Sequence, residues 1–265
     1  MKLSISQFPV SQNDPESNLS HIESVAASAK EAGSELICLP EMCTTGLDWE
    51  NNYKILDSSA DHITTIKRIA QLYSIAICGS FLEKTESGNA ANCFCYIDAI
   101  GNVLHMYRKI HLFTVFGEDK YAEKGNICEA FQTHHGTFGA GICYDLRFPE
   151  LFRRLAIQGS LLIFIPSAFP HPRLDHWRIL VRARAIENQC FIVATNQCGE
   201  ENHNTHELNT QYFGHSMLVD PWGDILIEGD NSVGMLVGEV NFSLIKKVRE
   251  EITAMDDLRS DIFHL

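Results

Sequence analysis

Strand-like and helix-like segments alternate along the whole 265-residue chain, and this alternation restricts the fold more than any other feature of the sequence. The segments "KLSISQF", "ELICLP" and "IAICGSF" are short and apolar, as buried strands are, and a helix-start signal at Asp14-Pro15-Glu16 lies between the first two. Residues 92–107 instead predict two antiparallel strands joined by a turn at Gly101-Asn102. Helices mixed with hairpins favour a layered α/β sandwich with mixed sheets over a purely parallel sheet.

The second half of the chain repeats this mixture. We expect a strand that ends at Cys143, a helix over about residues 149–158, a strand at "LLIFIP", a helix over about residues 175–189 and a strand at "FIVATN". The segments "GHSMLVDPWGDILIEG" and "GMLVGEV" then predict antiparallel strands that close the fold. No linker-like composition interrupts the pattern, so we expect a single domain over residues 1–265.

The charge balance and the absence of several motifs exclude broad classes of function. A formal net charge of -13 repels phosphate backbones and anionic lipid, so we expect no nucleic-acid partner and no membrane partner. No run approaches the roughly 18 apolar residues of a spanning helix, and the start of the chain lacks a leader pattern, which together predict a cytoplasmic protein. Neither GxxxxGK[ST] nor GxGxxG occurs, and we expect no cofactor.

The cysteines indicate reduced thiols rather than a disulfide framework. There are nine, an odd number, and several lie inside apolar runs, such as Cys38, Cys78 and Cys190. The pair Cys93 and Cys95 in "CFC" lacks the CxxC spacing and would point both thiols to one face of a strand. We therefore expect no metal site.

Cys143, in "FGAGICYDLRFPEL", is the cysteine most suited to chemistry. Gly139 and Gly141 lack side chains on the face that Cys143 shares, so another segment or a ligand can approach closely there. A helix is expected to begin near Pro149, and a nucleophile on a strand-to-helix turn is lifted clear of the sheet beside backbone N–H groups. An inert buried thiol is the alternative, and position alone leaves both open.

A nucleophilic cysteine needs a base or a cation beside it, because an ordinary thiol is only a few per cent ionised at neutral pH. Three histidines could serve, but nothing resembles the signature of a papain-like site; they are His111, His134 and His171. Glu41 and Lys109 each follow a predicted strand, and each alone could be an ordinary surface residue. Together with Cys143 they form a set that could carry out a reaction.

Three stretches in order, "LPEMCTTG", "YRKIHLF" and "GICYDLRFPEL", resemble the catalytic motifs of the nitrilase superfamily, the carbon-nitrogen hydrolases with a Glu-Lys-Cys triad. The likeness extends over nearly the whole chain, including "RARAIENQCFIVATNQCG" and "GHSMLVDPWGDIL". It implies a four-layer αββα sandwich, which agrees with the mixed pattern read from the residues.

The resemblance also implies roles for individual residues. Glu41 would be the general base and then the general acid, and Cys143 the nucleophile that forms a thioester. Lys109 and the backbone N–H of Tyr144 would hold the oxyanion. A second carboxylate supports the lysine in this superfamily, and "GEDKYAEKG" offers Glu118, with Glu123 as the other candidate in the same loop. Asp145 and Arg147 are expected to pair with each other at the turn.

Within the superfamily, "LPEMCTTG" and "PSAFPHPRLDHW" are most similar to the ω-amidases, which hydrolyse 2-oxoglutaramate and related monoamides of dicarboxylic acids. Such a small-molecule substrate carries a free carboxylate, and Arg173 could bind it, although a solvated loop arginine is the alternative. The same triad serves N-carbamoyl-amine hydrolases, aliphatic amidases and nitrilases. The resemblance therefore implies the type of bond that is hydrolysed, a C–N bond, more firmly than it implies the substrate. A catalytically silent interaction module is the alternative from another class.

The end of the chain bears on oligomeric state. In "MDDLRSDIFHL" the apolar residues Ile262, Phe263 and Leu265 follow an acidic stretch and could pack on a neighbouring subunit. Members of the superfamily commonly dimerise, and the resemblance therefore implies a homodimer.

Overall fold

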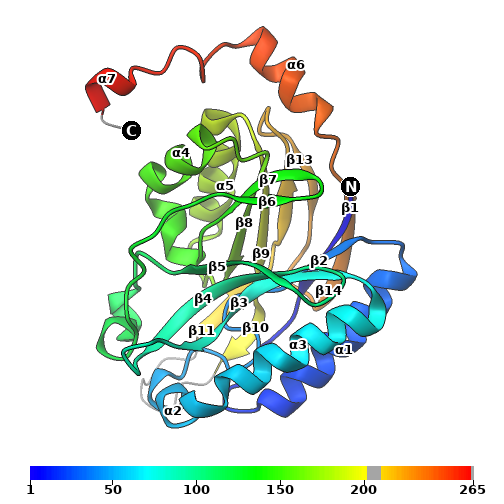
Figure 1. Ribbon diagram of the computed structural model, residues 1–265, viewed down its shortest axis with the longest axis vertical. Coiled ribbons are helices and arrows are strands. Elements are labelled where there is room, and N and C mark those ends of the chain that lie inside the picture. The colour runs from blue at the N-terminus through cyan, green and yellow to red at the C-terminus, as the bar shows by residue number, and fades with distance from the viewer. Residues whose placement is uncertain (202–209, 264–265) are drawn as a thin grey trace.

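The computed structural model describes residues 1–201 and 210–263, and its centre is a pair of six-stranded mixed sheets (Figure 1). The first sheet contains β1 (Lys2–Gln7), β2 (Leu36–Cys38), β3 (Ala76–Lys84), β4 (Ala90–Ile97), β5 (Val103–Arg108) and β14 (Gly234–Glu239), in the order β14-β1-β2-β3-β4-β5. The second contains β6 (Phe131–Thr133), β7 (Gly136–Ala140), β8 (Leu162–Ser167), β9 (Phe191–Asn196), β12 (Met217–Val219) and β13 (Ile225–Glu228), in the order β13-β12-β9-β8-β7-β6.

Helices cover the outer face of each sheet, which makes four layers (Figure 1). The first sheet is covered by α1 (Pro15–Glu31) and α3 (Ser59–Tyr73), and the second by α4 (Pro149–Ile157) and α5 (Leu174–Asn188). Asp14 caps α1 by accepting a hydrogen bond from the Ser17 N–H at 3.0 Å, as the helix-start signal predicted. The αββα sandwich expected from the sequence is therefore confirmed.

Aromatic side chains fill the space between the two sheets. The Phe94 ring of β4 stacks on the Phe164 ring of β8 with centroids 5.9 Å apart, and Tyr96 packs on Phe138 of β7 at 6.4 Å. All four side chains are buried. This contact fixes the position of the strand ends of one sheet relative to those of the other.

The glycines before Cys143 make room for a helix rather than for a ligand. A Cβ built at Gly139 would lie 3.0 Å from Leu155 Cδ1 of α4, and one built at Gly141 would lie 3.3 Å from the Phe152 ring. Strand β7 also ends earlier than expected, at Ala140, because the chain turns toward α4 before it reaches Cys143.

Several elements lack a clear sequence pattern. They are α2 (Trp49–Lys54), the hairpin of β10 (Cys198–Glu201) and β11 (Thr210–Phe213), α6 (Ser243–Glu251), α7 (Ser260–Phe263), and short 3₁₀ turns at Leu56–Ser58, Thr114–Phe116, Glu118–Lys120 and Cys143–Arg147. The hairpin lies against the segment after β8, where the His171 N–H donates to the Gln211 carbonyl at 2.9 Å. It therefore supports one side of the site described below.

All nine cysteines are free, as expected, and Cys93 and Cys95 lie in the same buried cluster beneath α1 and α3.

Helix α7 lies away from the two sheets, and Ile262 and Phe263 are exposed, whereas Leu265 lies outside the described residues (Figure 1). Among the described residues, no helix combines the length and the apolar composition that crossing a membrane requires.

Candidate active site

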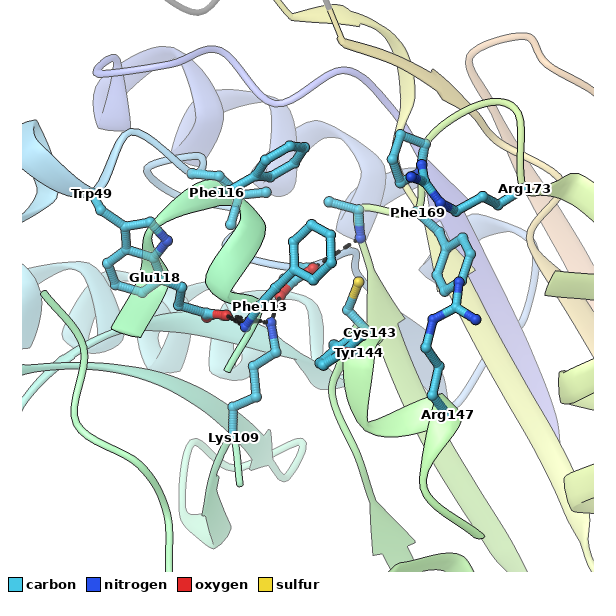
Figure 2. A pocket seen from close by; sticks show the side chains of 14 residues that line it. Trp49, Lys109, Phe113, Phe116, Glu118, Cys143, Tyr144, Arg147, Phe169 and Arg173 are labelled. Carbon is cyan, nitrogen blue, oxygen red and sulfur yellow. Dashed lines mark hydrogen bonds and ion pairs between the residues drawn. The ribbon is translucent and has the colours of Figure 1, made fainter. Parts of the chain in front are cut away.

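Glu41, Lys109 and Cys143 line one pocket, although they are far apart in the sequence (Figure 2). Each follows a strand: Glu41 comes after β2, Lys109 directly after β5, and Cys143 after β7. The Lys109 Nζ donates a hydrogen bond to Glu41 Oε1 at 2.8 Å, and both side chains are at most 2% exposed. The structure thus brings together the three residue types that the sequence singled out.

Glu118 also contacts the lysine. The Lys109 Nζ donates to Glu118 Oε2 at 2.9 Å and to Oε1 at 3.2 Å, and the Phe113 N–H donates to Oε2 at 2.6 Å. Glu123, the other candidate in this loop, instead accepts a hydrogen bond from Thr85 Oγ1 at 3.0 Å. Of the two candidates, Glu118 is the one that lies beside Lys109. We call Glu41, Lys109 and Glu118 the lysine wall of the pocket.

The two carboxylates keep Lys109 charged despite its burial. Burial alone would lower the pKa of Lys109, but the charges of Glu118 and Glu41 outweigh it, and the pKa lies well above its ordinary value. The Lys109 Nζ contacts three carboxylate oxygens, and the longest of these hydrogen bonds, to Glu118 Oε1, is 3.2 Å. Lys109 thus contributes a buried positive charge to the wall of the pocket.

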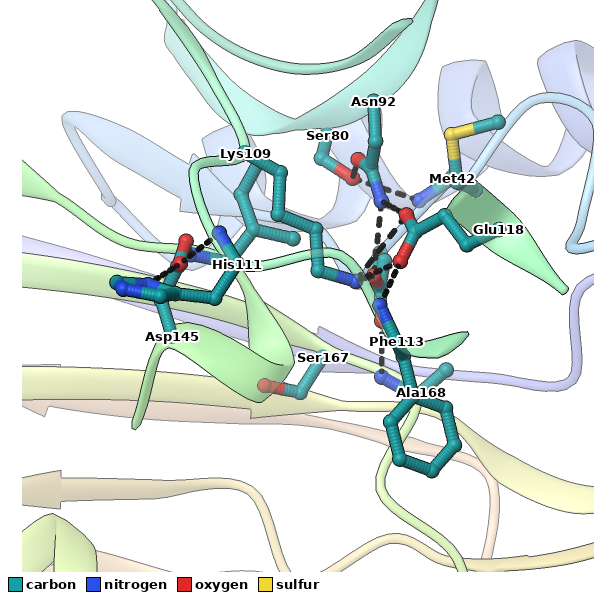
Figure 3. Close-up of polar contacts among 12 residues, drawn as sticks. Met42, Ser80, Asn92, Lys109, His111, Phe113, Glu118, Asp145, Ser167 and Ala168 are labelled. Atoms are coloured by element: carbon teal, nitrogen blue, oxygen red, sulfur yellow. Dashed lines mark hydrogen bonds and ion pairs between the residues drawn. The ribbon is translucent and has the colours of Figure 1, made fainter. Parts of the chain in front are cut away.

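Asn92 and Ser80 hold the carboxylates in place, and sequence reasoning did not identify them (Figure 3). The Asn92 Nδ2 donates to Glu41 Oε1 at 2.8 Å and to Glu118 Oε1 at 3.1 Å. Ser80 Oγ donates to Asn92 Oδ1 at 2.8 Å and accepts from the Met42 N–H at 2.8 Å. Both residues are fully buried inside apolar strands, and a polar residue in such a strand requires a partner, which is the signal that could have revealed them.

Cys143 begins a one-turn helix and has a strained backbone. Its φ of 44° lies in the left-handed region that non-glycine residues rarely adopt, and such strain is typical of a nucleophile at a sharp strand-to-helix turn. Burial raises the pKa of the Cys143 thiol well above its ordinary value, the Glu41 carboxylate raises it further, and Lys109 and the Ala168 N–H oppose this only in part. The resting thiol is therefore protonated, and its activation requires a base.

Glu41 is oriented to be that base. Its Oε2 accepts a hydrogen bond from the Ala168 N–H at 3.0 Å, while its Oε1 accepts the bonds from Lys109 and Asn92. These contacts fix the carboxylate beside the thiol of Cys143, which itself interacts with Glu41 and with the Ala168 N–H. The arrangement suits proton transfer between sulfur and carboxylate.

The expected pairing of Asp145 with Arg147 is wrong. Asp145 is fully buried and accepts hydrogen bonds from Tyr107 Oη at 2.8 Å, from His111 Nδ1 at 2.7 Å and from the Ile142 N–H at 2.9 Å. The His111 N–H donates a fourth bond to Asp145 Oδ1 at 3.0 Å, so both carboxylate oxygens are already in use. Asp145 therefore joins the turn that bears the nucleophile to the segment that bears the lysine. This contact also occupies His111, one of the histidines considered as a base.

Arg147 instead lines the pocket together with Arg173 (Figure 2). The Arg147 Cζ lies 5.2 Å from the centroid of the Phe169 ring, on the side of Cys143 away from the lysine wall. Arg173, which from the sequence could be either a carboxylate partner or a solvated loop residue, also lies in the pocket lining. We call Arg147, Phe169 and Arg173 the arginine wall.

The rest of the lining is mostly apolar. It includes Leu47, Trp49, Phe113, Phe116, Tyr144, Ala168 and Pro170. Tyr144 follows the nucleophile directly in the one-turn helix, where backbone N–H groups lack helical partners. Apolar surroundings weaken solvent screening, so the charged groups of both walls act more strongly on a bound molecule than they would in water.

A group of potential metal ligands lies elsewhere. Within the described part of the chain, Glu35, His134 and His135 have ligand atoms within 4.8 Å of one another, and none of the three lines the pocket. The pocket itself offers a base, a buried cation and a nucleophile. Chemically, that set suits attack of sulfur on a carbonyl or nitrile carbon, with the lysine stabilising the negative charge that develops.

Comparisons with known proteins agree with this geometry. The profile of the carbon-nitrogen hydrolase family matches residues 2–250. A 2-oxoglutaramate amidase of Bacillus subtilis is 34% identical over 99% of this chain and 100% of its own, and a deaminated glutathione amidase of Synechocystis is 34% identical over 90% and 91%. A crystal structure of a carbon-nitrogen hydrolase from Helicobacter pylori superposes with a TM-score of 0.94 at 21% identity, over 100% of this chain and 97% of that one.

Proposed function

Since the chain belongs to the carbon-nitrogen hydrolase family, we propose that it hydrolyses the amide of a dicarboxylic acid monoamide through a thioester on Cys143. The observation that carries this proposal is the buried ion pair between Lys109 Nζ and Glu41 Oε1, 2.8 Å apart, in the pocket that Cys143 also lines. A cation and a base held in this way serve an attack that generates negative charge on oxygen.

In the acylation step, Glu41 takes the proton of the Cys143 thiol while the sulfur attacks the amide carbon. The carbonyl oxygen becomes negatively charged and is held by the Lys109 ammonium group and by the backbone N–H of Tyr144. When the tetrahedral intermediate collapses, its C–N bond breaks and Glu41 delivers the proton to nitrogen. Ammonia leaves, and the acyl group remains on sulfur.

In the deacylation step, Glu41 takes a proton from water, whose oxygen attacks the thioester carbon at the same oxyanion site. The C–S bond breaks, the thiol regains its proton from Glu41, and the carboxylic acid product leaves. Glu118 holds the Lys109 ammonium in place while the charge on Glu41 changes. This division of work explains why the lysine needs two carboxylates.

The substrate class is supported by two independent features. The Bacillus subtilis relative is a 2-oxoglutaramate amidase, and 2-oxoglutaramate is the monoamide of a dicarboxylic acid. The arginine wall supplies cations that a neutral amide does not need, and Arg173 is one candidate for the carboxylate partner. N-carbamoyl amines, simple aliphatic amides and nitriles are the alternatives that the same triad could attack.

A panel of substrates tests the proposal. Ammonia release is measured with 2-oxoglutaramate, 2-oxosuccinamate, succinamate, glutaramate, an N-carbamoyl amine and a simple nitrile. We expect turnover of the monoamides, with 2-oxoglutaramate among the best. Turnover of only the carbamoyl compound or only the nitrile would contradict the proposed substrate class and retain the triad chemistry.

A catalytically silent interaction module is the competing hypothesis. Iodoacetamide labelling separates the two: the proposal requires that alkylation of Cys143 abolish ammonia release, with a loss of activity that follows labelling of that residue. A silent module has no activity to lose.

We also propose that the protein is a cytoplasmic homodimer. Ile179 and Ile186 on α5 are 65% and 49% exposed, and Phe263 on α7 is 66% exposed. A second copy packed on α5 and α7 would cover these apolar side chains. Light scattering coupled to size exclusion should give twice the chain mass, and Ile179→Glu should shift the protein toward monomer; a monomeric wild-type protein would contradict the dimer.

A further inference from the structure

Two histidines and a glutamate meet at the end of the sandwich opposite the pocket. Glu35 directly precedes β2, and His134 and His135 form the turn between β6 and β7, near the start of β1 (Figure 1). One side-chain nitrogen or oxygen atom of each lies within 4.8 Å of those of the other two. Strands β2 and β7 lead from these residues to Glu41 and Cys143 at their other ends. The three residues, which we call the histidine cluster, are therefore separate from the pocket.

The turn places both imidazoles on one side. Neighbouring residues of a strand point to opposite faces, but here the ring centroids of His134 and His135 lie only 3.8 Å apart. The Thr133 hydroxyl fixes the turn, since it accepts from the His135 N–H at 3.1 Å and donates to the Gly136 carbonyl at 2.9 Å. Two imidazole nitrogens can thus reach one ion without a change of the backbone.

The contact between His135 and Glu35 has a separation that suits two ligands of one ion. His135 Nε2 lies 3.1 Å from Glu35 Oε2, but the contact lacks hydrogen-bond geometry, and among residues 1–201 and 210–263 this buried nitrogen has no hydrogen-bond partner. Two ligands of a tetrahedral ion with bonds of about 2.0 Å lie about 3.3 Å apart. The observed separation is close to that value.

Neighbouring groups hold two of the three side chains. Glu35 Oε1 accepts a hydrogen bond from the Lys2 N–H at 2.9 Å, while its Oε2 faces His135. The Phe242 ring packs near the His135 ring, with centroids 6.3 Å apart. Outer contacts of this kind orient metal ligands before the ion binds. His134 is exposed, so its side chain can turn to complete the set.

The residue types favour a divalent transition metal. Imidazole nitrogen and carboxylate oxygen both suit Zn²⁺, which binds two histidines and one glutamate in some proteins and leaves its fourth position to water. Mg²⁺ prefers oxygen ligands, of which this cluster offers a single carboxylate. The expectation that the chain has no metal site rested on its cysteines, and none of them belongs to this cluster.

We propose that Glu35, His134 and His135 bind one Zn²⁺ ion. The ion joins the two sheets, because Glu35 borders a strand of the first sheet and both histidines border strands of the second. A ligand that binds only the folded chain stabilises it by mass action, so the site stabilises the packing of the sheets. It takes no part in the hydrolysis proposed above, since none of its residues lines the pocket.

Equilibrium dialysis against Zn²⁺ tests the site, with full-length protein that carries no histidine tag and has been freed of metal with a chelator. We expect one Zn²⁺ per chain for the wild type. His134→Ala and His135→Ala should each weaken binding by at least about 100-fold, because loss of an outer partner alone costs up to about 100-fold. Glu35→Gln keeps the shape of the side chain and should weaken binding by about tenfold.

Two controls accompany these variants. His176→Ala removes an exposed histidine of α5, far along the chain from the cluster, and should bind Zn²⁺ as the wild type does. An excess of Mg²⁺ should leave the bound Zn²⁺ in place. Displacement by Mg²⁺ would show attraction by charge alone and would contradict the proposed ligand set.

Two dialysis results would overturn the inference. If the wild type binds no Zn²⁺, Glu35 and His135 form an ordinary surface ion pair. If the wild type and the three cluster variants bind equally, the ion lies on other residues, such as the cysteines.

A second readout needs only the wild-type protein. Co²⁺ at the histidine cluster should give weak visible absorption bands and should lack the intense near-ultraviolet band that a thiolate ligand produces. Zn²⁺ should displace this Co²⁺ at one equivalent per chain. A thiolate band would assign the metal to cysteine and refute the proposed site.

Discussion

The two walls of the pocket are built on opposite principles. On the lysine wall the polar groups lie almost wholly inside the protein and bind to one another: Lys109 contacts two carboxylates, and Asn92 bridges the same two. On the arginine wall both cations are half-buried and lack an acidic partner among the described residues. The first wall is satisfied before any substrate arrives, and the second becomes satisfied only when an anion binds.

This difference separates the chemistry from the choice of substrate. Preorganised groups stabilise a transition state because they do not have to reorganise during the reaction. Unpaired cations at a pocket discriminate between molecules because a ligand without a carboxylate leaves them unpaired. Changes on the lysine wall should therefore slow the hydrolysis of every amide, whereas changes on the arginine wall should alter which amide is preferred. The following predictions test the lysine wall, from the largest expected effect to the smallest.

Glu41→Gln should have the largest effect. The amide keeps the shape of the side chain but cannot take the thiol proton, and kcat should fall by about 10,000-fold for all amides. The Cys143 pKa should fall, because the Glu41 charge is one of the causes that raise it. Alkylation of Cys143 by iodoacetamide at neutral pH should then become faster while turnover disappears. Slower alkylation together with lost turnover would contradict this account of the thiol.

Lys109→Met should lower kcat by about 1,000-fold, since it removes an oxyanion donor. It also leaves Glu41 and Glu118 buried without their cation, so the free energy of unfolding should fall by about 3 to 5 kcal/mol. Urea denaturation measures the second effect. An unfolding free energy equal to that of the wild type would show that the two buried carboxylates do not depend on the lysine.

Glu118→Gln should lower kcat by about 100-fold, the effect of one misplaced oxyanion donor. Glu118 is the main charge that raises the Lys109 pKa, so its removal lowers that pKa, and the ammonium is lost at a lower pH than in the wild type. The decline of kcat/KM at high pH should therefore begin at lower pH in this variant. Glu123→Gln, in the same loop but bonded to Thr85, is the matched control and should keep the wild-type pH profile.

Ser80→Ala should have the smallest effect. It leaves the Met42 N–H and Asn92 Oδ1 without the partner that they share, and Asn92 then holds the two carboxylates less firmly. We expect kcat to fall by about tenfold and the unfolding free energy by about 1 to 3 kcal/mol. A stability loss with unchanged kcat would show that Ser80 supports the strand and does not position the site.

The lysine wall could be predicted from the sequence, whereas of the two arginines on the arginine wall only Arg173 could. Glu41, Lys109 and Cys143 each follow an apolar strand, and strand ends of a layered sheet protein meet at one edge, so local pattern is enough to bring them together. Arg147 lies two residues after Asp145 in the sequence, and the two opposite charges were expected to pair. In the structure Asp145 does not pair with Arg147, because Tyr107 and His111, from a distant segment, hydrogen-bond to the aspartate.

The elements of the fold differ in the same way: local sequence pattern predicts some of them, and contacts between distant segments determine the others. Strands and helices with clear periodicity were predicted to within a few residues, as for β9 and α5. The early end of β7 and the hairpin of β10 and β11 depend on contacts with α4 and with the segment after β8, which are far away in the sequence. The roles of Asn92 and Ser80 also depend on distant contacts, because their hydrogen-bond partners come from other elements.

The most direct test of the central claim is mass spectrometry of the protein quenched during turnover of glutaramate, with the Cys143→Ala variant treated in parallel. We predict that the wild-type protein carries the glutaryl group on the peptide that contains Cys143, and that the variant carries none and releases no ammonia while remaining folded. Ammonia release by Cys143→Ala, or an acyl group on a different residue of the wild type, would contradict the mechanism.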